Sequence, residues 1–117
     1  MTATVEKLFE ASWVDVCPVE QMNEFVGVCA KVGNAQVAVF LVEGNLYALD
    51  NHDPFSEANV LSRGIVGDLS GELVVASPIY KQHFRLKDGG CLEDESVSLP
   101  LYQVRICEGM IQVEKPA

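Results

Sequence analysis

Short apolar segments separated by turns rich in glycine and asparagine run along most of the chain, and this pattern constrains the fold more than any other feature. The last two segments, residues 101–107 and 110–113, flank the turn Glu108-Gly109. Apolar and polar residues alternate strictly in the first of them, which predicts a strand with one buried face. The other expected strands are residues 13–16, 25–31, 36–42, 46–50, 65–68, 72–76 and 83–87.

Helical signals are few. Residues 18–23 begin with Pro18, which suits the start of a helix, and residues 55–61 are the other candidate for a single helical turn. Evenly spaced short strands with frequent turns predict an all-β antiparallel sandwich or barrel. We find no internal repeat or linker in the sequence, so we expect one domain covering residues 1–117.

The hydropathy pattern indicates a cytoplasmic protein. Residues 37–42 form the longest apolar run, which suits a buried strand and is too short for a membrane helix. Residues 1–10 contain two Glu and one Lys and no long apolar stretch, so they do not resemble a signal peptide.

The charge balance excludes two classes of partner. The net charge is −9, from 17 acidic and 8 basic residues. Nucleic acids and anionic membranes both require a cationic surface, so we expect neither as a partner.

Four cysteines are present, and their spacing contains no Cys-x-x-Cys pair of the kind that builds a thiolate zinc site. In a cytoplasmic protein they are expected to be free thiols, mostly as small core residues. They are Cys17, Cys29, Cys91 and Cys107.

Two proline-containing segments are the most informative local feature. Residues 51–55 read Asn-His-Asp-Pro-Phe, and residues 76–80 read Ala-Ser-Pro-Ile-Tyr. Together with residues 84–89 and 99–105, they make the chain from Leu46 onward resemble a Rieske-type ferredoxin domain. Such domains carry Cys-x-His in the first loop and Cys-x-x-His in the second, because one iron takes two thiolates and the other two imidazoles. The corresponding positions here, called the former ligand positions below, are Asp53, Phe55, Ser77 and Tyr80.

None of the former ligand positions keeps its ligand type, so the resemblance implies a Rieske-like fold without its own cluster. Residues 53–56, 60–64 and 84–94 carry a closer similarity, to the small subunits of the cytoplasmic NAD(P)H-dependent nitrite reductase. That resemblance implies a large catalytic subunit as partner, which holds FAD, an iron–sulfur cluster and sirohaem and reduces nitrite to ammonia. It implies an accessory role for this chain, with no cofactor and no catalytic residue of its own.

Two interpretations of the aromatic former ligand positions remain open. In the first, Phe55 and Tyr80 pack with Pro54, Pro78 and Ile79 as an apolar plug that replaces the cluster as the link between the loops. In the second, the rings are partly exposed and form a patch that binds a partner.

Cationic residues alternate with Gln82, Phe84 and Leu86 just after the second loop, at the period of a strand. One hypothesis is a docking face for an acidic surface of the large subunit. The alternative is an ordinary solvated face whose charges pair with Asp88 or with the acidic run at residues 93–95. The candidate partner-binding residues are Arg63, Lys81, His83, Arg85 and Lys87.

Metal binding and catalysis by this chain alone are disfavoured. His52 and Asp53 are neighbours that point to opposite sides of an extended chain, so they do not make a two-histidine carboxylate site with His83. A cysteine–histidine pair would need Cys17 or Cys91 close to a histidine, and no nucleophile elbow or dinucleotide fingerprint is present. The alternative functions are a Rieske-type electron carrier with an unusual cluster and a cofactor-free adaptor or ligand-sensing domain.

Overall fold

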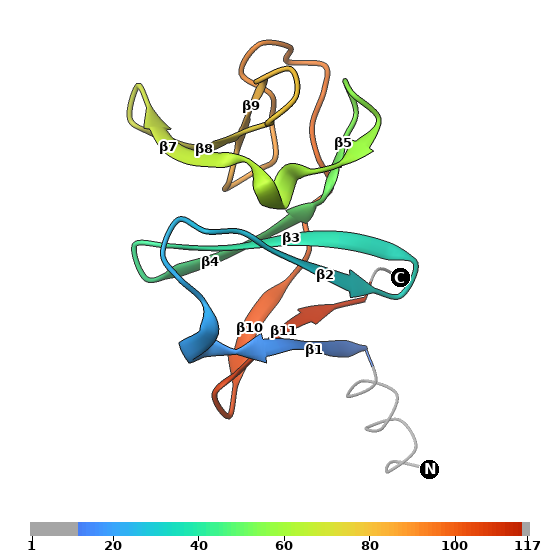
Figure 1. Ribbon diagram of the computed structural model, residues 1–117, viewed down its shortest axis with the longest axis vertical. Coiled ribbons are helices and arrows are strands. Elements are labelled where there is room, and N and C mark those ends of the chain that lie inside the picture. Colours follow the sequence, from blue (N-terminus) through green and yellow to red (C-terminus); the bar gives the residue numbers. More distant parts are fainter. Residues whose placement is uncertain (1–11, 116–117) are drawn as a thin grey trace.

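The computed structural model describes residues 12–115, which form an antiparallel all-β structure (Figure 1). The strands are β1 (Trp13–Pro18), β2 (Val28–Val32), β3 (Ala35–Val42), β4 (Asn45–Asp50), β5 (His52–Asp53), β6 (Ala58–Asn59), β7 (Ile65–Leu69), β8 (Glu72–Ala76), β9 (His83–Arg85), β10 (Val104–Cys107) and β11 (Met110–Glu114). Two short 3-10 helices, η1 (Val19–Gln21) and η2 (Leu61–Arg63), complete the described elements.

The strands form three layers that are stacked along the long axis in Figure 1. The lower sheet has the order β1-β11-β10, the middle sheet β2-β3-β4 and the upper sheet β7-β8-β9, with the small β5-β6 hairpin beside the upper sheet. The expected all-β antiparallel class is therefore confirmed.

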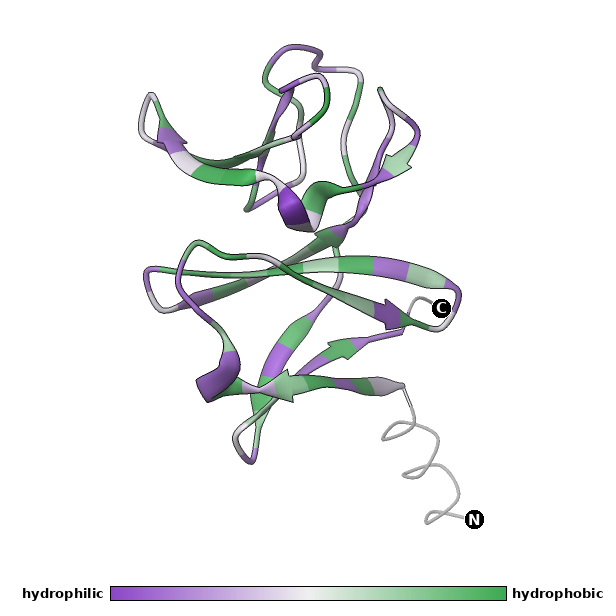
Figure 2. Cartoon of the chain, in the orientation of Figure 1, coloured by the Kyte–Doolittle hydropathy of each residue, from purple (hydrophilic) through white to green (hydrophobic). Residues whose placement is uncertain are grey.

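Strand β3 explains how one apolar run serves two cores. Phe40 and its same-face neighbours pack into a core with the upper sheet, which includes Val75 and Phe84. Val37 and Val39 point the other way, into a second core with Ile111 of β11. Because both faces of β3 are covered, its sequence is almost continuously apolar, as Figure 2 shows along its ribbon.

The expected helical turn at residues 55–61 is wrong. Ala58–Asn59 instead pairs with His52–Asp53 as the β5-β6 hairpin, and the 3-10 turn begins only at Leu61. The reason is local: the Glu57 N–H donates to the Asp53 carbonyl at 2.8 Å, which closes a tight turn in which Glu57 has φ +57°. The expected turn after Pro18 is present as η1.

The strand expected at residues 25–31 begins later, at Val28. Phe25 has φ +66°, a left-handed conformation that interrupts an extended strand and is rare for a bulky aromatic residue. Its N–H donates to the Leu41 carbonyl at 2.9 Å, so this segment is still held against the middle sheet.

Two glycines bring η2 close to its neighbours. A Cβ on Gly64 would collide with the Ala76 carbonyl of β8, and a Cβ on Gly27 would collide with the Ser62 carbonyl. Gly64 has an ordinary φ of −71°, so it is required for close packing against β8 and not for a turn. The segment between η2 and β7 is thereby fixed beside the second loop.

The four cysteines are free thiols, but the expectation that most lie in the core is wrong. Cys91 is buried, Cys17 and Cys107 are half-buried, and Cys29 is exposed on β2. No helix within residues 12–115 is long and apolar enough to cross a membrane.

Candidate functional site

The two loops that hold the former ligand positions meet through their first members. Asp53 ends the short strand β5, Ser77 follows β8, and both side chains are buried. The Ser77 hydroxyl donates a hydrogen bond to Asp53 Oδ2, and the Phe55 N–H donates to Asp53 Oδ1 at 2.9 Å. One carboxylate thus organises its own loop and links it to the other.

The Asp53 carboxyl is held in its ionised form. Burial raises its pKa, but hydrogen bonds from the Ser77 hydroxyl and from the Phe55 and Ser56 N–H groups lower it by more, so the net pKa lies below the ordinary value. A buried charge that accepts several hydrogen bonds is the arrangement expected of a fixed structural carboxylate.

Asn51 anchors the first loop to the middle of the molecule, and the sequence analysis did not single it out. Its side chain is buried, and its Oδ1 accepts the Ser62 N–H at 2.6 Å. Its backbone N–H donates to the Gln36 carbonyl at 2.9 Å, and its carbonyl accepts the Leu61 N–H at 3.1 Å. The signal available in the sequence was an asparagine directly after the apolar strand expected at residues 46–50. Once such a side chain is buried, it needs several polar partners.

Phe55 and Tyr80, the second members of the two former ligand pairs, have different environments. The half-buried Phe55 ring packs against Phe84 with the ring centroids 6.2 Å apart, as part of the upper core. Tyr80 is 61% exposed and its neighbour Ile79 is 45% exposed. Of the two interpretations left open by the sequence, the common plug of Phe55 and Tyr80 is therefore wrong: the half-buried Phe55 ring packs against the upper core, and Tyr80 is exposed to solvent.

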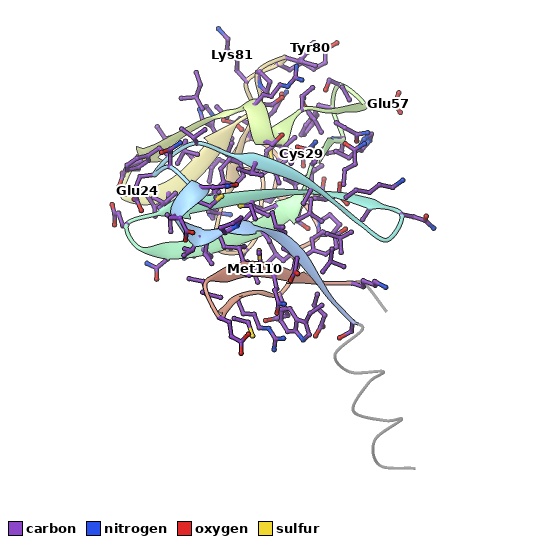
Figure 3. The ribbon with its side chains drawn as sticks, turned by 60° about the horizontal axis from the view of Figure 1, so that its bottom comes forward. Glu24, Cys29, Glu57, Tyr80, Lys81 and Met110 are labelled. Atoms are coloured by element: carbon purple, nitrogen blue, oxygen red, sulfur yellow. The ribbon has the colours of Figure 1, made fainter. Side chains whose placement is uncertain are left out.

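The second loop presents an exposed end of the molecule. Its base is closed by a hydrogen bond of 2.9 Å from the Ser77 N–H to the Gln82 carbonyl, and Lys81 adopts φ +63°. Figure 3 shows Tyr80 and Lys81 at this end, with their side chains directed away from the ribbon. We call the exposed residues here the tip surface: Pro54, Pro78, Ile79, Tyr80 and Lys81.

Of the candidate partner-binding residues, two contact carboxylates of this chain and three form no ion pair with another described residue. His83 Nδ1 lies 2.6 Å from Glu93 Oε2, and Arg85 Nε lies 2.8 Å from Glu72 Oε2. Lys81, Lys87 and Arg63 are exposed, and none of them forms an ion pair with another residue of the described range. The predicted alternation is present around β9, since Phe84 and Leu86 are buried, but two of its charges are locally compensated.

The pairs shift the pKa values of their members. The Glu72 carboxylate raises the pKa of Arg85, chiefly through their hydrogen bond. Burial raises the pKa of Glu93, but hydrogen bonds from the backbone N–H and side chain of His83 lower it by more. The net pKa of Glu93 therefore lies below its ordinary value. Arg85 therefore contributes less attraction to a partner than its charge alone would indicate, and the His83 ring is already in contact with Glu93.

Cys91 and His83 do not form a nucleophilic pair. The Cys91 thiol lies 3.7 Å from Glu93 Oε1, and the same carboxylate group also contacts His83. Burial raises the pKa of the Cys91 thiol, which keeps it protonated and disfavours a thiolate nucleophile.

The residues at the former ligand positions do not fit a Rieske cluster. A phenylalanine ring has no donor atom, and the Asp53 and Ser77 oxygens are committed to each other. His52 is exposed and contacts Asn59 Oδ1 at 3.1 Å, whereas the adjacent Asp53 is buried. Among residues 12–115, no group of three or more His, Cys, Asp or Glu side chains is placed to hold a metal ion.

Comparison with known proteins assigns the chain to a family. A family model described as "Rieske-like [2Fe-2S] domain" matches residues 12–114. The nitrite reductase (NADH) small subunit of Escherichia coli K12 is 44% identical over 105 residues, covering 88% of this chain and 97% of that protein. The chain belongs to this Rieske-like family, among the nitrite reductase small subunits.

Solved structures agree with this family assignment. The crystal structure described as a putative NADH-dependent nitrite reductase small subunit from Mycobacterium tuberculosis is 45% identical, with a TM-score of 0.86. The match covers 90% of this chain and 96% of that one. In this chain a hydrogen bond between the Ser77 hydroxyl and the Asp53 carboxylate joins two of the former ligand positions expected from the sequence.

A third relative has a different chain organisation. The nitrite reductase [NAD(P)H] large subunit of Klebsiella oxytoca is 40% identical over 101 residues, which are 86% of this chain but only 11% of that protein. A domain of this family is therefore also found within a much longer polypeptide.

Proposed function

We propose that this chain is the accessory small subunit of an NAD(P)H-dependent nitrite reductase and supports the reduction of nitrite to ammonia by a large catalytic subunit. In this proposal the large subunit carries FAD, an iron–sulfur cluster and sirohaem, and this chain binds none of them. The whole chain, residues 1–117, acts as one domain of a cytoplasmic complex that contacts neither nucleic acid nor membrane.

The contact between Asp53 and Ser77 is the observation that carries the accessory role. It keeps the two loops together by a hydrogen bond to an ionised carboxylate, so the domain retains the Rieske shape without an electron carrier. Without redox chemistry of its own, the chain contributes by binding and positioning.

The organisation of the Klebsiella oxytoca relative supports direct association with the catalytic chain. When two modules share one polypeptide, their effective concentration reaches the millimolar range, and a weak contact becomes persistent. A separate small subunit must obtain the same persistence from its own surface, which implies a specific docking face.

The tip surface is the best candidate for that face. Tyr80 and Ile79 expose apolar area beside the former cluster site, and Lys81 adds a charge without an ion-pair partner in the described range. Tyrosine is enriched at the centres of interfaces, whereas an exposed lysine such as Lys81 contributes mainly to the electrostatic attraction between partners. Arg63, directly before the Gly64 that packs against Ala76, extends the positive potential toward an acidic surface on the large subunit. Lys87 lies with Gly71 and Glu72 at the other end of β8, so it is a separate candidate contact, and the paired residues His83 and Arg85 lie along β9 between the two.

The test is a titration of the purified large subunit with this chain under anaerobic conditions, with NAD(P)H-dependent nitrite reduction as the readout. We expect a saturable rise in rate and co-elution of the two chains in size-exclusion chromatography. Absence of both would reject the subunit assignment. Iron bound stoichiometrically by the purified chain, with a visible absorption band, would instead support an electron carrier.

A further inference from the structure

Strand β7 is an edge of the upper sheet, and two of its five residues have backbone groups that no other described segment pairs. It pairs only with β8, across a two-residue turn in which Ser70 has φ +55° and Gly71 has φ +85°. In such a hairpin the residues flanking the turn form a hydrogen-bonded pair, and pairs then alternate along the ladder. The N–H and C=O groups of Val66 and Asp68 therefore point away from β8, and no backbone hydrogen bond to another described segment uses them.

Strand β7 has few of the features that usually protect an edge. Proteins blunt exposed edges with charged side chains, above all lysine, and with proline, bulges or covering loops. The register between β7 and β8 is unbroken, and the only charged residue of β7 is Asp68. Two other edge strands are protected: β1 has an irregular register between Asp15 and Cys17, and β2 carries Lys31.

Exposed apolar side chains flank this free edge. Ile65 is 76% exposed and Leu69 is 41% exposed, and their spacing of four residues places them on one face of β7. Between them lies Gly67, where an added Cβ would meet no atom within 4 Å. A second strand laid along β7 would find both open hydrogen-bonding groups and apolar area.

The partner-binding surface already described is continuous with β7. Ile65 pairs with Ala76, the residue that precedes Ser77 and the second loop. Arg63, which has no ion pair within residues 12–115, lies two residues before the start of β7. The exposed segment containing Val26 is also close, because the adjacent Gly27 abuts η2.

We propose that β7 accepts an extended segment of the large subunit, which adds a fourth strand to the β7-β8-β9 sheet. This inference rests on the proposed function. The donated strand would place apolar side chains against Ile65 and Leu69 and a cationic side chain near Asp68. Main-chain hydrogen bonds to Val66 and Asp68 would give affinity, and the alternate side chains would give specificity.

A second copy of this chain is a poorer occupant of the same edge. Each copy carries a net charge of −9, and pairing of β7 with its own mate would bring two Asp68 carboxylates onto one short ribbon. Like charges directly opposite each other on paired strands are destabilising, and the net charge of the two copies adds a general repulsion.

The direct test is a variant that blocks the free edge of β7. Asp68→Pro removes an N–H that points away from β8, so it leaves the β7-β8 ladder intact while preventing a bond to an added strand. Asp68→Ala is the matched control, because both variants lose the charge and the side-chain bond to the Gly71 N–H. Binding of the full-length chain to the purified large subunit should weaken about tenfold in Asp68→Pro relative to Asp68→Ala.

A second variant keeps the test decisive where the proline variant does not fold. Ile65→Lys places a charge in the apolar flank of the edge, and Ile106→Lys, at an exposed isoleucine of β10, is its control. We expect only Ile65→Lys to weaken binding. Equal binding of both lysine variants and the wild type would overturn the edge proposal while leaving the subunit assignment in place.

Hydrogen exchange distinguishes strand addition at β7 from binding elsewhere on the chain. The amides of Val66 and Asp68 should exchange fast in the free chain and become protected when the large subunit is added. Binding of the wild type without protection of these two amides would reject strand addition. No binding of the wild type at all would reject the proposed function instead.

Discussion

The Ser77 hydroxyl and the Asp53 carboxylate, 24 residues apart in the sequence, join the loop after β8 to the loop after β5. In a Rieske ferredoxin a cluster crosslinks the two ligand loops by four metal–ligand bonds. In this chain a charge-assisted hydrogen bond joins the two loops, and the packing of Phe55 on Phe84 ties the first loop to β9.

Removing the donor of this bond should destabilise the fold. Ser77→Ala leaves a buried carboxylate without its inter-loop partner, which costs about 1–3 kcal/mol of unfolding free energy. Urea denaturation measures the loss, and Ser98→Ala, at an exposed serine, is the control that should change it by less than about 0.5 kcal/mol. Equal stability of Ser77→Ala and the wild type would mean that the contact does not hold the loops.

The same contact predicts a pH dependence. The pKa of Asp53 is lower in the folded chain than in the unfolded chain, so the unfolded state binds the proton more tightly. Its stabilisation is present above the ordinary aspartate pKa of about 4 and is lost as the pH falls toward the lower folded value. Glu93 and Asp94 also have lowered pKa values and contribute in the same acidic range.

The contribution of Asp53 is isolated by substitution. Asp53→Asn should be less stable than the wild type at neutral pH, and the difference should shrink as the pH is lowered through the acidic range. Unfolding free energies measured at a series of pH values test this convergence. A difference that is constant with pH would show that the ionisation of Asp53 does not differ between the two states.

Substitutions at Phe55 and Tyr80 should have different effects, one on the stability of the fold and the other on binding of the large subunit. Phe55→Ala removes a half-buried ring from the upper core and should cost about 2 kcal/mol of unfolding free energy. Tyr80→Ala should change stability by less than about 0.5 kcal/mol but weaken association with the large subunit. Thermal denaturation and binding measured on the same preparations decide this, and the reverse pattern would contradict the roles assigned to the two rings.

Much of the fold could be predicted because its strands follow local rules. Residues 72–76 were expected as a strand from their apolar pattern, and β8 has the same bounds. The β5-β6 hairpin was missed because its two-residue strands have no apolar alternation and depend on hydrogen bonds to Asp53. Such contacts leave no periodic signal in the sequence.

The site was predictable only in part. The resemblance suggested four former ligand positions, yet it could not say that Phe55 packs against the core and Tyr80 points away from it, because both residues are aromatic. The pairing of Arg85 with Glu72 was also missed, since it depends on the register of β8 against β9 and the nearest acidic residue in sequence is Asp88.

Gly64 gives a test of how the site is positioned. Its φ of −71° suits any residue, so Gly64→Ala should destabilise only through the collision of the new methyl group with the Ala76 carbonyl, by about 1–3 kcal/mol. Gly67→Ala, on the same strand pair but with open space around the added methyl group, should be close to neutral. Urea denaturation of both variants would show whether close approach or glycine flexibility matters here.

Charge reversal tests the electrostatic part of docking. Lys81→Glu combined with Lys87→Glu should weaken binding to the large subunit about tenfold, mainly by slowing association, and should reduce its dependence on salt. Lys31→Glu combined with Lys115→Glu changes the net charge by the same amount at exposed positions outside the tip surface and β9. Association rates measured at low and high ionic strength compare the two pairs. If both pairs slow association equally, the large subunit responds to the overall charge of the chain and not to Lys81 and Lys87 in particular.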